Sequence, residues 1–335
     1  MNGFKLAAMA IVIAAGFSAL AAKAQTVVKV DGSSTVFPIS EAAAEDFQKL
    51  KKGAVKVTVG MSGTGGGFKK FCIADASLRI DVADASRPIT AKEMEACKAA
   101  GVKYVELPVA FDALTVVVNQ KNPLNSISVE ELKAMWEPAA QGKITNWKQV
   151  NPAFPDRELK LFGPGTDSGT FEYFTEATVG KSKSSRGDYT ASEDDNVLVQ
   201  GVSRDLGGIG YFGYAYYAEN KSKLKALAIT PAGGKTAVLP SEKAVIDGSY
   251  NPLARPIFIY VNADSAKRPE VKEFIEFYLK NAGKYSQEVK YVPLSAADYK
   301  HAADNFGKLR TGTAFGGHNE VGVKVSDLLK REPKE

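Results

Sequence analysis

The sequence predicts an α/β protein of two lobes in which the chain leaves the first lobe and later returns to it. Segments rich in β-branched residues alternate with amphipathic helical segments, as in sheets covered by helices. Strand-like runs are interrupted at residues 108–112, and another run begins after residues 255–256, which predicts two crossings between the lobes. We therefore expect one lobe from residues 25–111 and 254–335, and a second lobe from residues 112–253.

Residues 1–24 have the pattern of a cleavable secretion signal. Lys5 precedes an apolar run from Leu6 to Ala22, and the small residues Ala22 and Ala24 form an A-x-A cleavage pattern. The competing interpretation is a membrane anchor, but the run is short for a bilayer crossing. We expect cleavage after Ala24 and a mature protein exported to the periplasm.

The charge of the mature chain is mildly positive. The whole sequence has a formal net charge of +5, and removal of the two lysines Lys5 and Lys23 with the signal reduces +5 by 2 to +3. Nucleic-acid-binding surfaces need clustered basic residues. This balance argues against a nucleic-acid partner and leaves room for a local cationic site for an anion.

Cys72 and Cys97 are the two cysteines of the chain, and both remain after cleavage of the signal. In an oxidising compartment we expect one disulfide between them, and two buried thiols are the alternative. The two histidines, His301 and His318, lie in the C-terminal part and do not complete a zinc-binding pattern with the cysteines. We expect no metal and no cofactor.

Three predicted strands each lead into a turn rich in glycine and hydroxyl side chains, and each turn leads into a helix. The strands are residues 26–30, 55–59 and 159–162, and the turns read DGSST, GMSGTGGG and GPGTDSGT. The first backbone N–H groups of a helix lack partners within it, and its N-terminus carries a partial positive charge that favours anions. A single serine or threonine there more often caps the helix. Three such turns in one chain predict a shared anion site.

A fourth segment, DVADASRPIT at residues 81–90, places Ser86 and Arg87 at the end of another predicted strand. A guanidinium group presents donors that match two oxygens of an oxyanion at once. Arg87 is therefore either a ligand of the anion or a member of a surface or structural ion pair, and spacing alone does not separate these alternatives.

The C-terminal part contains a helix followed by an extension. Apolar residues recur on one helical face over residues 271–279, and Gly283 is expected to end this helix. We expect the helix to pack on the first lobe. From Arg310 onward the sequence is glycine-rich and then charged, which predicts a peripheral extension.

Several segments of the mature chain, taken in order, resemble those of a known family. They read DGSSTVFP, GMSGTGGGFKKF, DASRPIT, LPVAFDALTVVVN, KITNWKQVNP, GPGTDSGTFEYF and GGIGYFGYAYY. Their combination resembles the phosphate-binding proteins of bacterial ABC transporters, which belong to the periplasmic substrate-binding superfamily. The resemblance implies two α/β lobes joined at a hinge, with one inorganic phosphate held between them and delivered to a membrane permease. It also implies a monomeric binding protein rather than an enzyme.

The resemblance implies which residues hold the phosphate. The first turn supplies backbone amides and a hydroxyl from residues 34–36, and residues 168–170 match the Ser-Gly-Thr of the family. An extra glycine in the second turn leaves open whether Ser62 or Thr64 takes the role of the family's serine. The full predicted set is Ser34, Thr35, Val36, Ser62, Thr64, Ser86, Arg87, Ser168, Gly169, Thr170 and Arg186.

One departure from the family affects the expected positive charge of the site. Well-known members have an arginine shortly before the Ser-Gly-Thr, where this chain has Pro164 and Gly165. We expect Arg87 to replace this cation as the main charged ligand, with Arg186 as a second candidate.

A second departure affects selectivity. The family places an aspartate, which accepts the proton of hydrogen phosphate, where this chain has Ser86. Fully ionised sulfate has no proton to offer, so the preference for phosphate over sulfate depends on another acceptor. Asp84 and Asp167 are the candidates, although Asp167 can equally cap the following helix.

Three other functions compete with phosphate transport. The string TDSGT superficially resembles the nucleophile region of serine proteases, but neither His301 nor His318 lies in a motif that would supply a base. A binding protein for another oxyanion, such as arsenate, sulfate or molybdate, would use much the same amides and hydroxyls. An adhesive or signalling protein at the cell surface would keep the fold and use other faces.

Overall fold

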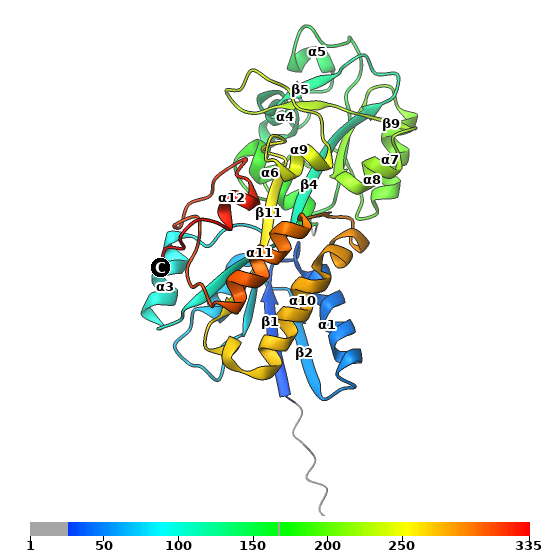
Figure 1. Cartoon of the computed structure of the whole chain (residues 1–335). Helices are drawn as coiled ribbons and strands as arrows, with labels where there is room; N and C mark the ends of the chain where they lie inside the picture. Colours follow the sequence, from blue (N-terminus) through cyan, green and yellow to red (C-terminus); the bar gives the residue numbers. More distant parts are fainter. Residues whose placement is uncertain (1–25, 167) are drawn as a thin grey trace, which may run out of the picture.

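The computed structural model describes residues 26–166 and 168–335. The predicted secretion signal and Asp167 lie outside these residues. The fold is α/β and two-lobed, as the sequence predicts, and two long strands run through the junction between the lobes (Figure 1).

The sheet of the first lobe begins with three parallel strands. β1 (Thr26–Gly32) lies between β2 (Val55–Gly60) and β3 (Val82–Ala85), and it runs parallel to both. β11 (Ala254–Asn262) pairs antiparallel with β3 on one side and with β4 (Tyr104–Asn119) on the other. The carboxyl ends of the three parallel strands therefore lie at one edge, and the turns that follow them are neighbours.

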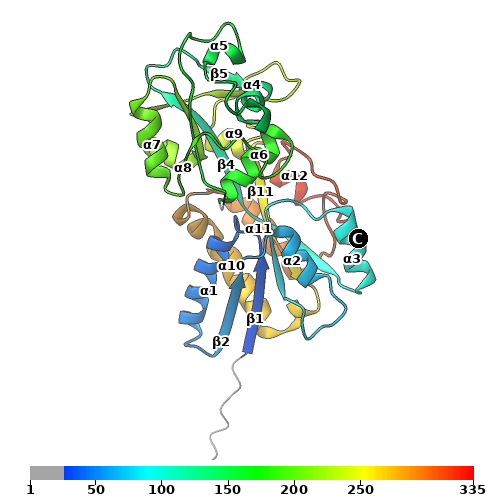
Figure 2. The ribbon, with the colours of Figure 1, turned by 180° about the vertical axis from the view of Figure 1, so that it is seen from behind.

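Helices cover both faces of this sheet. α10 (Pro269–Glu288) lies in front of the sheet in Figure 1, and α2 (Thr64–Phe71) lies in front of it in Figure 2, which shows the molecule from behind. α1 (Phe37–Leu50) packs on α10, with the ring centroids of Phe47 and Phe274 5.4 Å apart. The other elements of this lobe are α3 (Ala91–Ala99), η2 (Ser265–Lys267), β12 (Val292–Pro293), α11 (Ala296–Gly307) and α12 (Val325–Leu328).

The second lobe has a smaller sheet. β8 (Gly208–Gly213) pairs antiparallel with the second half of β4 and parallel with β6 (Lys160–Gly163), which in turn pairs with β7 (Thr190–Ala191). α6 (Gly169–Val179) follows β6 after a short loop. The other elements are β5 (Ser126–Ser128), α4 (Val129–Trp136), η1 (Pro138–Ala140), α5 (Trp147–Val150), α7 (Asp195–Arg204), α8 (Tyr214–Glu219), β9 (Leu224–Ala226), β10 (Ala228–Thr230) and α9 (Glu242–Ile246).

Aromatic side chains hold α6 against the sheet of the second lobe. The rings of Phe174 and Tyr211 are stacked with their centroids 3.6 Å apart, and Trp136 meets Tyr211 edge-on at 5.0 Å. All three side chains are fully buried. Burial of such large apolar groups fixes the position of α6 on the sheet.

No helix within residues 26–166 and 168–335 is long and apolar enough to span a bilayer.

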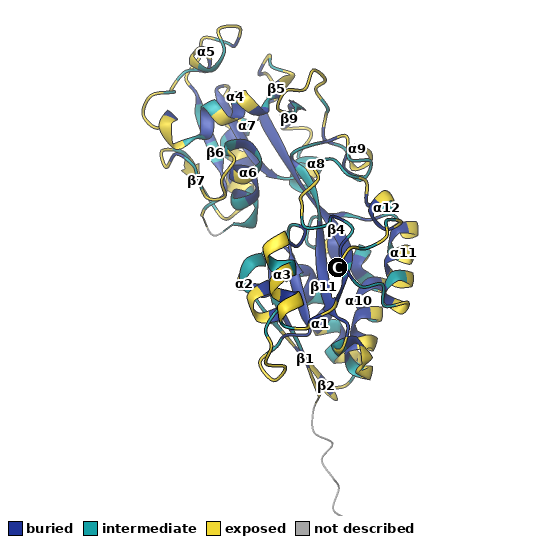
Figure 3. Cartoon of the chain, turned by 90° about the vertical axis from the view of Figure 1, so that its left-hand side faces the viewer, coloured by how far each residue is buried: buried dark blue, intermediate teal, exposed yellow. Residues whose placement is uncertain are grey.

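β4 is shared by both lobes. Its residues 104–113 pair with β11, residues 114–118 pair with β8, and the strand is buried along almost its whole length (Figure 3). The break predicted around Pro108 is wrong, because the strand continues through this proline. Proline donates no backbone hydrogen bond, and the ladder accommodates it with a bulge opposite Ile257 and Phe258.

The predicted end of α10 at Gly283 is also wrong, since the helix continues to Glu288. A methyl group built on Gly283 would lie 3.2 Å from the ring of Tyr299 in α11. The glycine therefore allows two helices to approach closely and does not end the first of them.

The segment after Arg310 is not the peripheral extension that the sequence predicted. Thr313 Oγ1 donates to Glu106 Oε2 at 2.6 Å, and Ala314 N donates to Glu106 Oε1 at 2.9 Å. Thr313 and Phe315 are buried. The carboxylate of Glu106 and the buried side chain of Phe315 hold this segment on β4, beside the junction of the lobes.

The predicted disulfide is confirmed. Cys72 at the end of α2 is bonded to Cys97 in α3, 25 residues away in the sequence. The bond fixes the two helices that follow β2 and β3, and these helices flank two of the predicted anion-binding turns.

Replacing both cysteines by alanine is expected to lower the free energy of unfolding by about 3 kcal/mol, because the cross-link restricts a 25-residue loop of the unfolded chain. Urea unfolding followed by circular dichroism would measure the change. Reduction of the parent protein with dithiothreitol should produce the same loss. Equal stability of the parent and the double variant would contradict this role.

Candidate functional site

The turns after β1, β2 and β3 are joined by backbone hydrogen bonds. Ser33 N donates to Asp84 O at 2.9 Å, which joins the first turn to β3, and Gly63 N donates to Gly32 O at 2.7 Å, which joins the first turn to the second. Ligands of open α/β sheets bind outside the carboxyl ends of the strands. The turns that follow β1, β2 and β3 therefore form one continuous surface of the first lobe.

Two glycines permit this close approach. Gly32 has φ +147°, and a methyl group built on it would lie 2.2 Å from Asp84 O. A methyl group on Gly67 in α2 would lie 2.7 Å from the Cα of Gly32. Larger residues would therefore push α2 and β3 away from the first turn.

The helices α1 and α2 begin without a side-chain cap. Their N-cap residues are Val36 and Gly63, and neither makes a side-chain cap hydrogen bond. By contrast, Thr90 and Ser128 cap α3 and α4 through their hydroxyls. The N-termini of α1 and α2 thus keep N–H groups and a partial positive charge for a ligand.

The second turn brings Thr64 to Ser86 and takes Ser62 elsewhere. The two hydroxyls Thr64 Oγ1 and Ser86 Oγ are 3.2 Å apart, and Ser86 N donates to Thr64 Oγ1 at 3.1 Å. Ser62 Oγ instead donates to Asp31 Oδ1 at 2.6 Å, and Asp31 also binds Lys70. Of the two hydroxyls that the sequence left open, Thr64 is the one next to Ser86.

The start of α6 meets the first lobe at Thr35. A methyl group built on Gly169 would lie 2.7 Å from Thr35 Oγ1 and 3.6 Å from Ser34 Oγ. Ser168 Oγ accepts a hydrogen bond from Thr170 N at 3.2 Å, so this serine caps its own helix. The Ser-Gly-Thr segment of the second lobe thus lies against the first turn of the first lobe.

Arg87 is held by a carboxylate. Its Nη1 and Nη2 donate to the two oxygens of Glu93, each at 2.9 Å. The pair raises the pKa of Arg87, and hydrogen bonds from Arg87 and Thr90 lower the pKa of Glu93 although burial opposes this. The structural ion pair that the sequence left open is therefore present, and Arg87 lies next to Ser86 at the edge of the cleft.

None of the observed contacts of Arg186 involves the turns of the first lobe or the start of α6. It is buried, and its Nε and Nη2 bind Asp188 at 2.5 and 2.8 Å. Its Nη1 donates to the carbonyl oxygens of Met135 and Ile144. Hydrogen bonding to Arg186 lowers the pKa of Asp188 to about 2. These contacts give Arg186 a structural role within the second lobe.

Asp84 lies beneath the first turn. Its side chain is fully buried, its Oδ1 accepts a hydrogen bond from Ser40 Oγ at 2.9 Å, and its Oδ2 has no partner among the described residues. Burial raises the pKa of Asp84 well above its usual range. A protonated Asp84 adds no negative charge beneath the site.

An acidic group borders the loop before α6. A methyl group built on Gly165 would lie 2.0 Å from Glu193 Oε1. Asp194 and Asp195 follow at the start of α7. Burial together with the charges of Asp194 and Glu193 raises the pKa of Asp195 to about 6.

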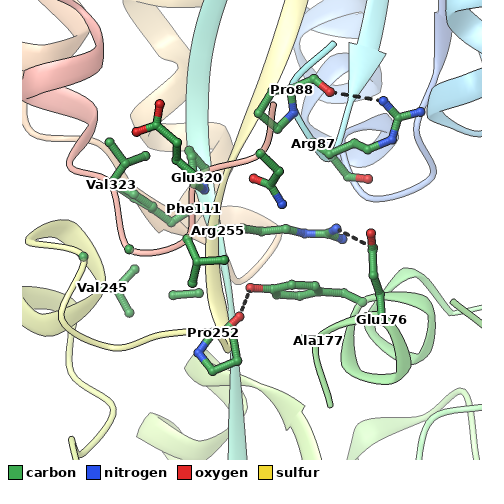
Figure 4. A pocket seen from close by; sticks show the side chains of 18 residues that line it. Arg87, Pro88, Phe111, Glu176, Ala177, Val245, Pro252, Arg255, Glu320 and Val323 are labelled. Atoms are coloured by element: carbon green, nitrogen blue, oxygen red, sulfur yellow. Dashed lines mark hydrogen bonds and ion pairs between the residues drawn. The ribbon is translucent and has the colours of Figure 1, made fainter. Parts of the chain in front are cut away.

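The sequence patterns did not indicate that charged and aromatic residues at the strand crossings form part of a site. Arg255 in β11 lies 3.4 Å from Asp112 Oδ2 and 3.7 Å from Glu176 Oε2, and its guanidinium stacks 3.7 Å from the ring centroid of Tyr173. Figure 4 shows Arg255 extending across a pocket towards Glu176. Arg255 was visible in the sequence beside a predicted crossing, but its partners come from distant segments.

The chain matches the PBP superfamily domain over residues 19–282. The chain belongs to the PBP superfamily. This confirms the family resemblance predicted from the sequence.

Three relatives show how far the similarity extends. Protein SphX of Synechococcus elongatus is 56% identical over 331 residues, which cover 97% of this chain and 96% of that protein. The phosphate-binding protein PstS of Staphylococcus saprophyticus is 40% identical and covers 85% of each chain. The crystal structure of a possible phosphate binding protein from Planctomyces limnophilus has a TM-score of 0.78 at 47% identity, and covers 85% of this chain and 98% of that one. The chain is similar to these PBP superfamily members over most of its length.

Replacing Gly169 by alanine is expected to weaken anion binding at least tenfold without unfolding the protein. The added methyl group would lie 2.7 Å from Thr35 Oγ1 and would hold the lobes apart. Alanine is also the better helix former, so the thermal midpoint of the unliganded variant should not fall. Isothermal titration calorimetry and thermal unfolding would measure both effects.

Gly307 provides the matched control for this variant. It lies in a helix, and a methyl group built there would meet nothing within 4 Å. Gly307→Ala should leave binding unchanged. Unchanged binding in Gly169→Ala as well would mean that the two lobes do not close at this point.

Replacing Asp195 by asparagine is expected to raise the thermal midpoint at pH 7.5 and to have a smaller effect at pH 4.5. The pKa of Asp195 is about 6 in the folded protein, above its unfolded value, so its ionised form opposes folding above pH 6. The parent gains stability as the pH falls from 6 towards 4, and the variant lacks this gain. A difference that is independent of pH would contradict the assignment.

Proposed function

We propose that this protein captures inorganic phosphate between its two lobes and delivers it to the permease of an ABC transporter. The observation that carries the proposal is the approach of Gly169, at the start of α6, to the hydroxyl of Thr35 across the cleft. Two uncapped helix N-termini on the same edge of the first lobe add further donors. The names of the relatives support phosphate as the anion.

The proposed chemistry is replacement of the hydration shell of the anion by oriented dipoles. Backbone amides of residues 34–36 and the hydroxyls of Thr35, Thr64 and Ser86 serve from the first lobe. Residues 168–170 serve from the second lobe. Because the donors come from both lobes, the anion loses its water only when the lobes meet, which couples binding to closure.

Arg87 is proposed as a source of positive charge, acting from the edge of the pocket that it lines together with Ser86. Its guanidinium is shared with Glu93, so its net contribution is smaller than that of an unpaired arginine. Several neutral donors then carry most of the stabilisation. Asp84 is not proposed as the acceptor of the ligand's proton, because its side chain is fully buried and burial raises its pKa. The Ser86 hydroxyl, which can accept as well as donate, is proposed in that role.

We propose binding without catalysis. Ser168, the serine of the protease-like string, caps its own helix by accepting from Thr170 N. His301 lies in α11 and His318 in the segment after it, and both are exposed. A serine nucleophile would need a base within hydrogen-bond reach.

The cellular setting follows from the same proposal. A phosphate-capturing protein that serves a permease acts outside the cytoplasm, and the disulfide between Cys72 and Cys97 suits an oxidising compartment. We propose export to the periplasm with cleavage after Ala24, and delivery by a monomer.

Titration calorimetry with phosphate, arsenate and sulfate tests the proposed function. We expect one phosphate per chain, with arsenate binding similarly and sulfate more weakly. Thr64→Val should reduce phosphate affinity by about tenfold to a hundredfold, because hydrogen bonds to a charged ligand contribute about 1.5–3 kcal/mol. Ser62→Ala is the matched control on the same turn, and its affinity should not change because its hydroxyl binds Asp31.

The possible outcomes distinguish the competing functions. Tighter binding of sulfate than of phosphate would identify a different oxyanion carrier. Failure to bind any of the three anions would favour a surface adhesive or signalling protein that keeps the fold.

A further inference from the structure

A second compartment of the cleft lies next to the proposed phosphate site. It is a pocket of about 220 Å³ at the strand crossings (Figure 4). Both lobes and the C-terminal segment contribute to its wall. Its apolar side chains include Phe111, Tyr173, Ala177, Val245 and Val323.

The pocket and the phosphate site share Ser86. This residue lines the pocket, and its hydroxyl is 3.2 Å from Thr64 Oγ1 at the start of α2. Arg87 also lines the pocket, and its Nη2 is 3.9 Å from a methyl group built on Gly65 in the same helix turn. The pocket is therefore adjacent to the proposed hydrogen-bond donors of the phosphate site.

The charged groups around the pocket are paired with one another. Arg87 binds Glu93, and Glu320 binds Arg331 at 2.7 and 2.9 Å. Arg255 lies between Asp112 and Glu176. A pocket whose charges are compensated in this way does not favour a second phosphate group, and its valine and aromatic side chains suit an uncharged organic group.

Ser86 suits a ligand that carries an organic group on its fourth oxygen. The Ser86 hydroxyl can donate as well as accept, so it can meet either a free phosphate oxygen or an ester oxygen. Because Ser86 lines the pocket, an organic group on that oxygen would extend into the pocket.

We propose that the protein also binds phosphate monoesters of small uncharged alcohols. The phosphoryl group occupies the helix N-termini, the ester oxygen lies at Ser86, and the organic group enters the pocket. This inference rests on the proposed function, since it uses the same phosphate site.

The size of the pocket fits such a group. A cavity of roughly 150 Å³ in another protein accepts benzene, so about 220 Å³ accommodates a glyceryl or phenyl group. Larger groups, such as nucleosides, would exceed it.

Calorimetric titration of the full-length mature protein with inorganic phosphate, glycerol 3-phosphate and phenyl phosphate tests the proposal. We expect both esters to bind with affinities within about a hundredfold of phosphate. Ala177→Leu and Val323→Phe fill the pocket from α6 and from the C-terminal segment. Each should weaken ester binding at least tenfold and change phosphate binding less than twofold.

Ala303→Leu, at an exposed position of α11, is the control for added bulk and should change neither affinity. Thermal unfolding of each variant checks that it folds. Phosphate binding without detectable ester binding by the parent would overturn this inference alone. Equal loss of both ligands in folded Ala177→Leu and Val323→Phe would also overturn it, whereas failure of the parent to bind phosphate would overturn the proposed function.

Discussion

The close contact between the start of α6 and the first turn is the constraint on which the site depends. Gly169 approaches Thr35 so closely that even one added methyl group would lie 2.7 Å from the threonine hydroxyl. This approach places the N-terminus of a helix from the second lobe opposite the uncapped N-termini of α1 and α2 from the first. Partial positive charges gathered in this way repel one another unless an anion lies among them. In the proposed function, closure of the lobes is therefore coupled to capture of the anion.

The crossing strands make that contact possible. β4 belongs to both sheets, and β11 pairs with its first half, so the lobes share one continuous buried ladder. The cluster of Arg255, Asp112 and Glu176 lies at these crossings, with opposing charges 3.4 and 3.7 Å apart. Burial raises the pKa of Asp112 although Arg255 opposes the shift. A polar cluster inside the junction ties the orientation of α6 to the strands that carry the first lobe.

Much of this arrangement could be predicted from the sequence, because the patterns that indicate a strand, a turn and a helix lie within short segments of the chain. The turns at residues 34–36, 62–64 and 168–170 each follow a predicted strand and precede a helical pattern. The partners could not be predicted, because they come from other segments. Ser62 and Thr64 look alike in the sequence, and only the fold turns one towards Asp31 and the other towards Ser86. Arg87 and Glu93 are six residues apart, and the ion pair between them becomes evident only in the folded structure.

A crystal structure of the mature protein grown with phosphate tests the central claim most directly. The account predicts a single tetrahedral anion that accepts hydrogen bonds from the turn at residues 34–36, from Thr64 and Ser86, and from residues 168–170, with both lobes in contact with it. An anion bound by one lobe alone, or bound away from these turns, would contradict the account.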